Sequence, residues 1–167
     1  MSGVASYLIS GWQLSGIVSV KSGQPFNVTA GTPTALSSLG FSRTPILNTT
    51  KKRQDLVLGR PGESVYYFDR SAFAFPAARE LGNVTKSFLI GPGAATWDFS
   101  LTKNSQVSEN WRLQFRGEFF NILNRANFRN PPGSLFTASG NLSGTAGIIT
   151  GTITTGRQVQ LGVKLIF

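Results

Sequence analysis

The chain of 167 residues contains no cysteine and no histidine. Without cysteine there are no disulfide bonds and no thiolate sites, and without histidine the commonest general base and the commonest metal ligand are missing. Only seven residues are acidic, and no two of them cluster at the spacing of metal ligands. The sequence is therefore poorly supplied for catalysis, and we expect no enzyme activity, no cofactor and no metal site.

Long hydrophobic runs are also missing. No stretch of about 18 apolar residues is present, so we expect no transmembrane helix. The start of the chain, Met1–Gly16, lacks a basic segment followed by a long apolar stretch and does not predict a signal peptide. A membrane barrel needs export, so on that interpretation the chain has lost its front end or is not exported as it stands.

Charged residues are scarce, at 14%, against the ~25% typical of soluble domains, yet the net charge is +9. A nucleic-acid-binding protein would gather its lysines and arginines on one surface and would bind with a salt-dependent affinity. Here they are scattered, with one short run at Lys51–Arg53. We interpret the charge as loop and rim charge and expect no nucleic-acid partner.

What the chain does contain is strict alternation, seen most clearly at its end, Arg157–Phe167. Every second residue there is apolar: Val159, Leu161, Val163, Leu165 and Phe167. Such alternation predicts a strand with one apolar and one polar face. Its length of about ten residues is that of a tilted strand crossing a bilayer, although a strand of a soluble sandwich has the same pattern.

Three earlier segments alternate in the same way: Trp12–Val28, Thr96–Lys103 and Trp111–Phe120. Ser22–Pro25 is expected to bend the first of them, and Met1–Ile9 is interpreted as the tail of a further strand. The pattern thus predicts about five antiparallel strands.

The second and third of these segments predict a hairpin joined by the polar stretch Asn104–Asn110. If the hairpin folds about Val107, the facing pairs are Phe99 with Phe115, Leu101 with Leu113, and Trp97 with Gly117. An aromatic side chain lying over a strand glycine is a recognised support for such a glycine.

The polar row of this hairpin distinguishes two classes of fold. It carries four charges that face one way: Asp98, Arg112, Arg116 and Glu118. In a soluble sandwich the row faces water, whereas in a membrane barrel it faces a wet lumen, where the arginines neutralise the carboxylates. The tryptophans fall near strand ends, as in interfacial belts, with Trp12 and Trp111 expected on one rim and Trp97 on the other. This placement favours the membrane barrel.

Two long segments, Ala30–Ala94 and Asn121–Gly156, show no persistent period. Within them, Ser71–Phe75 predicts one helical turn capped by Asp69, and Ser134–Gly156 has the composition of a flexible or irregular loop. If Phe167 ends on the periplasmic side, strand parity puts both long segments outside the cell and the short hairpin turn inside. Short inner turns and long outer loops are typical of outer-membrane barrels.

Several phrases together resemble the C-terminal end of TonB-dependent outer-membrane receptors, in particular the Oar-like group that often carries a carboxypeptidase-regulatory-like domain. They span nearly the whole chain: GWQLSGIVSVKSGQPFNV (Gly11–Val28), YFDRSAFAFP (Tyr67–Pro76), LGNVTKSFLIGPG (Leu81–Gly93), WDFSLTKN (Trp97–Asn104), LQFRGEFFNILNRANF (Leu113–Phe128) and the closing RQVQLGVKLIF. The resemblance implies a large barrel, a plug inside it and nutrient uptake driven by the TonB system. It also implies that Val163, Leu165 and Phe167 belong to the signal read by the barrel-assembly machinery. The plug, the TonB box and most barrel strands are missing from this sequence.

We therefore predict an all-β, antiparallel, up-and-down sheet over residues 1–167, the C-terminal strands of a transmembrane β-barrel. The expected role is ligand binding and transport across the bacterial outer membrane, with the two long segments contacting the ligand. The expected partners are outer-membrane lipid, the rest of the barrel and its plug, the assembly machinery and the TonB system. The alternative is a soluble β-sandwich module that binds carbohydrate or another ligand with Trp12, Trp97 and Trp111 gathered on one patch.

Overall fold

The computed structural model describes residues 9–31, 43–59, 63–77 and 80–167. The chain divides into two compact units. The sheet unit consists of Met1–Lys21, Ala94–Asn127 and Thr154–Phe167, and the loop unit consists of Ser22–Gly93 and Phe128–Ile153. The strand tail predicted at Met1–Ile9 lies, except for Ile9, outside the described residues.

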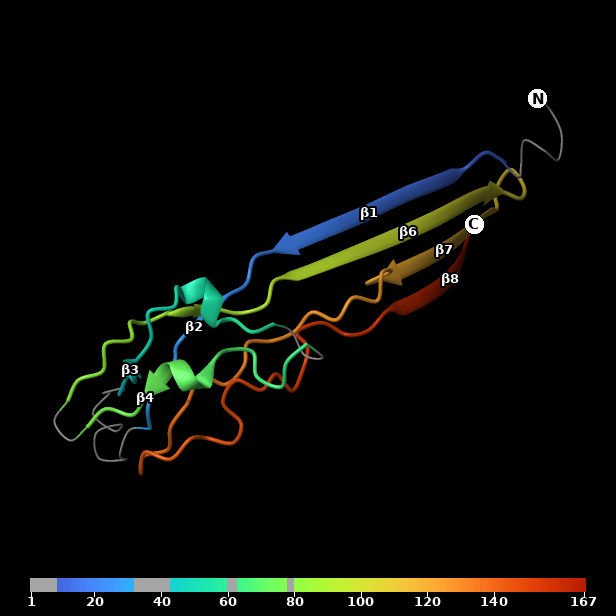
Figure 1. Ribbon diagram of the computed structural model, residues 1–167. Helices are drawn as coiled ribbons and strands as arrows, with labels where there is room; N and C mark the ends of the chain where they lie inside the picture. The colour runs from blue at the N-terminus through green and yellow to red at the C-terminus, as the bar shows by residue number, and fades with distance from the viewer. Residues whose placement is uncertain (1–8, 32–42, 60–62, 78–79) are drawn as a thin grey trace. The chain divides into compact units, whose positions relative to one another are not determined.

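The sheet unit contains four long strands: β1 (Trp12–Lys21), β6 (Ala94–Gln106), β7 (Arg112–Phe120) and β8 (Gln158–Ile166). They lie in the order β1-β6-β7-β8, and each pair of neighbours is antiparallel (Figure 1). This is the up-and-down arrangement that the alternation predicted. The strands have 10, 13, 9 and 9 residues, and a tilted strand needs roughly 9–11 to cross a bilayer.

The predicted first strand is shorter than its apolar pattern. β1 ends at Lys21, and the chain leaves the sheet at Ser22–Pro25, where the bend was predicted. The following residues, Pro25–Phe26, form β2, which pairs with β5 (Leu89–Ile90) in the loop unit. The alternating apolar pattern of Trp12–Val28 therefore spans two structural units, because the strands of both units need alternating apolar residues.

The predicted register of the hairpin between β6 and β7 is wrong. The observed pairing differs by an even number of residues, so each residue stays on the face of the sheet that was predicted for it. Phe99 lies opposite Phe119, not Phe115, and Leu101 lies opposite Gly117, not Leu113. Asn104–Gln106 were expected in the turn but continue β6, and the turn closes through hydrogen bonds between Trp111 and both Val107 and Ser108. A period of two fixes which face a residue occupies, but it permits any even shift, and the turn residues select among these shifts.

The loop unit has its own apolar core, although the elements in its described residues are all short. Besides β2 and β5 these are β3 (Ile46–Leu47), paired with β4 (Phe73–Ala74), and the 3₁₀ turns η1 (Arg53–Leu56) and η2 (Arg70–Ala72). The helical turn predicted at Ser71–Phe75 is η2, which ends at Ala72 because the next two residues form β4. The Asp69 side chain accepts a hydrogen bond from the Ser71 N–H, as a cap should. The buried apolar residues are Val28, Ala30, Leu56, Tyr67, Phe68, Ala72, Phe73, Val84, Leu89, Leu135, Phe136 and Ala146.

The segment Ser134–Gly156, which has the composition of a flexible or irregular loop, is held by specific contacts. Leu135 is fully buried, its N–H donates to the Thr29 carbonyl at 2.8 Å, and its carbonyl accepts from the Ser143 N–H at 2.8 Å. Phe136 packs edge-on against Phe75, with 5.5 Å between ring centroids. The expectation of an irregular segment is confirmed, since no helix or strand lies between β7 and β8. Its buried contacts were not foreseen, because they join residues far apart in sequence and leave no local period.

Candidate functional site

The candidate functional site is the four-stranded sheet, whose register separates two chemically different faces. Residues directly opposite one another share a face, so Leu14, Leu101, Gly117 and Leu161 form one rung. The neighbouring rung on the other face is polar and consists of Ser15, Ser100, Glu118 and Gln160. We call the first the apolar face and the second the polar face.

The apolar face is open. Leu161 and Val163 retain 66% and 70% of their accessible surface, and Leu14 retains 65%. The ring of Phe115, between β6 and β8, is still 38% exposed. A continuous apolar surface of this kind marks contact with lipid or with protein, because water would penalise it.

The aromatic residues are placed at two levels of this face. Trp12 lies opposite Lys103, whose ammonium is 5.2 Å from the indole centroid, and Trp111 packs against Phe167 at 5.7 Å. Both pairs are at the end of the sheet that carries the short β6–β7 turn. Trp97 lies opposite Val18, about 20 Å further along β6 at ~3.3 Å per residue. This arrangement is the one predicted for two interfacial belts, whose contact with a membrane stays a prediction.

Lys103 interrupts the apolar face, and sequence alternation alone did not explain it. It lies opposite Phe115 and donates a hydrogen bond to the Ser10 carbonyl. A lysine near the end of a membrane strand reaches toward the interface with its ammonium while its methylene chain stays on the apolar surface.

The three residues predicted as an assembly signal lie on or after β8. Val163 and Leu165 are on the apolar face, opposite Phe115 and Leu113, and Phe167 follows the strand with 89% of its surface exposed. They form an accessible apolar row at the end of an edge strand. Their recognition by an assembly factor stays a prediction.

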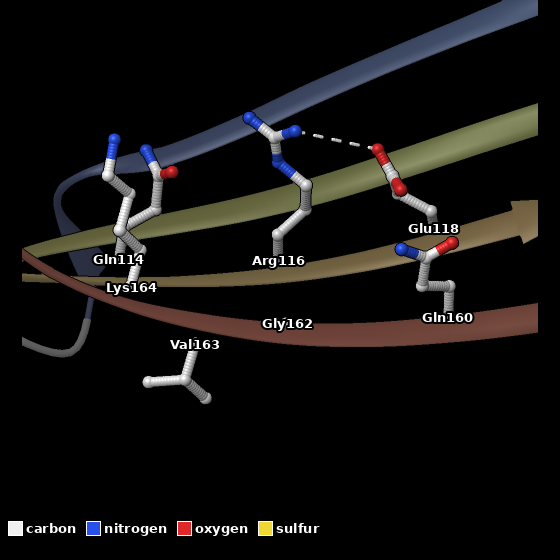
Figure 2. Close-up of a pocket in the computed structure, with 7 residues that line it drawn as sticks. All are labelled: Gln114, Arg116, Glu118, Gln160, Gly162, Val163 and Lys164. Carbon is white, nitrogen blue, oxygen red and sulfur yellow. Dashed lines mark ion pairs between the residues drawn. The ribbon is translucent and has the colours of Figure 1, made fainter.

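The polar face contains a hollow of about 330 Å³ over β7 and β8. Figure 2 shows Gln114, Arg116, Glu118, Gln160 and Lys164 on one side of the two strands and Val163 on the other. Gly162 lies opposite Arg116, and a methyl group added at Gly162 would meet no atom within 4 Å. The missing side chain at Gly162 therefore leaves the hollow open down to the backbone.

All four predicted lumenal charges are on the polar face, but only one pair of them makes an ion pair in the described structure. The Arg116 guanidinium is 3.6 Å from the Glu118 carboxylate, along the same strand (Figure 2). Asp98 instead accepts a hydrogen bond from the Asn121 N–H at 2.9 Å. Arg112 donates to the Gln106 side chain at 3.3 Å. The predicted neutralisation of Asp98 by an arginine was wrong, because Asp98 and Arg112 lie at opposite ends of the sheet.

Neutral side chains supply the remaining contacts of this face. The Gln114 amide donates to the Asn104 side chain at 2.8 Å across β6 and β7. Among the residues that the structure describes, no three histidine, cysteine, aspartate or glutamate side chains come together in a group able to hold a metal ion. The side-chain hydrogen bonds named here therefore connect neighbouring strands or neighbouring residues of this face.

No helix in the described ranges is long and apolar enough to cross a membrane.

Comparison with known families matches residues 1–160 to the outer membrane beta barrel domain. The chain belongs to this family. The family assignment confirms the predicted all-β, outer-membrane barrel fold and the location in the outer membrane. Neither the curated proteins nor the solved structures contain a match.

Sequence reasoning missed the asparagines that follow β7. Asn121 and Asn127 are 4% and 0% exposed, and their side chains hydrogen-bond to the backbone of neighbouring segments. The available signal was the recurrence of asparagine at every third position from Asn121 to Asn127, directly after a strand.

Proposed function

We propose that this outer-membrane barrel chain is part of a TonB-dependent receptor that binds a ligand outside the cell and transports it across the outer membrane. The observation that supports this most directly is the pairing of an open apolar face with a polar face in a meander of membrane-crossing length. Lipid would cover the apolar face, and the polar face with its hollow over Gly162 would line a wet lumen.

The connections between strands support the same proposal. β6 and β7 are joined by a short turn, whereas the segments between β1 and β6 and between β7 and β8 are long and contribute the compact loop unit. Long, structured connections at one end of a barrel are typical of the extracellular side. In this proposal the loop unit contacts the ligand, and the rest of the barrel, a plug and the TonB system supply what one four-stranded sheet lacks.

The sequence has no histidine and no cysteine, and the role that we propose is transport and not catalysis. The soluble carbohydrate-binding module is the weaker candidate, because it required the three tryptophans on one patch. Trp12 and Trp97 instead lie at different levels of the sheet.

An uptake experiment tests the proposal. Host cells with the gene intact or deleted would be given labelled ferric siderophores, cobalamin, oligosaccharides and oligopeptides, with and without a protonophore. We expect accumulation of at least one class to fall on deletion and to require the proton gradient. Unchanged accumulation of every class would contradict a role in transport, and a loss insensitive to the protonophore would contradict coupling to TonB.

A further inference from the structure

The register between β7 and β8 has no obvious local determinant. A hairpin register is normally set by its turn, as it is between β6 and β7. The connection from β7 to β8 runs from Asn121 to Arg157, and most of it belongs to the loop unit. Alternation on β8 permits any even shift, because Val159, Leu161 and Val163 are interchangeable in pattern. Something else must select the observed pairing.

Three asparagines in the segment that follows β7 make contacts that can select this pairing. The Asn121 side chain donates to the Thr155 carbonyl at 3.1 Å, and the Asn124 side chain accepts from the Arg157 N–H at 3.0 Å. Both partners lie in the short stretch that leads into β8. The end of β7 is thus tied directly to the start of β8.

Asn127 makes a different contact, with β6. Its side-chain oxygen accepts from the Ala95 N–H at 2.8 Å, and its side-chain nitrogen donates to the Ala95 carbonyl at 3.0 Å. One amide therefore binds both backbone groups of a strand residue, as a residue of a neighbouring strand does. β7 has already ended at this level, so the Asn127 amide takes the place of a β7 residue. The same amide nitrogen donates to the Thr154 hydroxyl at 3.0 Å.

The backbone of this segment also favours asparagine over most other residues at two positions. Asn121 and Asn124 both have φ of 49°, in the left-handed region where asparagine is among the best tolerated side chains. The Asn124 N–H donates to the Asn121 carbonyl at 2.7 Å, and the Asn121 N–H donates to Asp98 at 2.9 Å. These turns direct the three side chains toward β6 and β8.

We infer that Asn121, Asn124 and Asn127 form a clamp that sets the register of β8 against β7. The register matters for the polar face, because it places Gly162 opposite Arg116 and so opens the hollow. A shift of two residues in either direction would put Gln160 or Lys164 opposite Arg116 and move Gly162 opposite Gln114 or Glu118, which changes the side chains around the hollow. The three asparagines thus position the residues around the hollow, although none of them lines it.

The absence of cysteine from the chain allows a direct test by disulfide trapping. The pair Phe115→Cys with Val163→Cys reports the observed register, since these residues are opposite. The pairs of Phe115→Cys with Leu161→Cys or Leu165→Cys report shifts of two. Cα atoms more than about 7 Å apart do not form a disulfide without backbone movement, so each pair reports one register.

The full chain would be folded into lipid vesicles and oxidised in three backgrounds: unchanged, with all three clamp asparagines replaced by alanine, and with Asn104→Ala. Asn104 is the matched control, because it bonds Gln114 on the same sheet but contacts neither Asn127 nor the β8 lead-in. We expect the unchanged chain and the control to trap only the 115–163 pair. The clamp variant should trap a shifted pair in at least a tenth of the molecules.

Trapping of the 115–163 pair alone in the clamp variant would overturn the inference. If that variant does not fold, Asn124→Gly decides, because glycine keeps the left-handed backbone and loses the side chain that accepts from the Arg157 N–H. A shifted pair in Asn124→Gly supports the clamp, and its absence there, with the 115–163 pair intact, overturns it.

Discussion

The two units of this chain use the same apolar residue types in opposite ways. Leu56 and Phe68 of the loop unit are fully buried, whereas Leu161 and Phe115 of the sheet unit remain 66% and 38% exposed. The loop unit buries its apolar side chains in its own core, as a protein in water must. The sheet unit presents them outward, as a protein in lipid does. The difference is the one that we expect of a chain with one unit in water and one sheet in lipid.

The largest expected effect comes from a matched leucine substitution in each unit. Leu56→Ala should leave a cavity in the core and destabilise the loop unit by about 2–5 kcal/mol. Leu161→Ala should cost much less, because lipid chains can fill the space of an exposed side chain. The rate of proteolysis in the loop unit as a function of urea measures the first effect, and unfolding of the sheet in vesicles measures the second. Equal costs would remove the distinction between the units.

A charge placed on either face of β7 sharpens the comparison within the sheet. Phe115→Arg puts a guanidinium on the apolar face near mid-strand and should cost about 2–4 kcal/mol of stability in lipid. Gln114→Arg, one residue away on the polar face, should be tolerated. Urea titration of both variants in vesicles gives the two values. A polar-face variant as damaging as Phe115→Arg would contradict the assignment of the faces.

Lowering the pH should weaken the loop unit through Asp69. The Lys51 ammonium, 2.8 Å away, and the Ser71 hydroxyl lower the pKa of Asp69 below its ordinary value of 3.8. Because the pKa is lower when folded than when unfolded, the stabilisation is complete above about pH 4 and is lost as the pH falls through the folded pKa.

Comparison of Asp69→Asn with the unchanged chain between pH 5 and pH 2 isolates this contribution. The amide keeps a capping oxygen but does not titrate, so the stability difference between the two chains should shrink as the pH falls. Asp69→Ala also loses the cap and should cost about 0.5–2 kcal/mol at neutral pH. A stability difference between Asp69→Asn and the unchanged chain that is independent of pH would show that the Lys51 contact does not matter.

The smallest effect is expected on the polar face. The charged groups of Arg116 and Glu118 are 3.6 Å apart, and the Arg116 side chain is 52% exposed. Because water screens the pair, it contributes only about 0–1 kcal/mol to the stability of the sheet. Arg116→Ala should therefore change solute binding or conductance more than stability. Current through vesicles and urea midpoints, measured side by side, distinguish the two. A urea midpoint that falls as far as that of Phe115→Arg would mean that the pair is structural.

The sequence was sufficient for the strands of the sheet and their two faces, and insufficient for the strand register and for the contacts beyond the sheet. Alternation predicted which residues of β8 share a face, because side-chain direction in a strand has a period of two. It did not predict that Phe99 faces Phe119, since every even shift satisfies the same pattern. The burial of Leu135 and Asn127 also escaped prediction, because their partners are distant in sequence and leave no period to read.

The central claim is that one face of the sheet contacts lipid and the other contacts water. Single cysteines introduced in turn at Gln114, Phe115, Arg116 and Gly117 would be spin-labelled in vesicles and probed with oxygen, which concentrates in lipid, and with a water-soluble nickel complex. We predict strict alternation, with nickel reaching positions 114 and 116 and oxygen reaching 115 and 117. Equal access of the nickel complex to all four positions would contradict it.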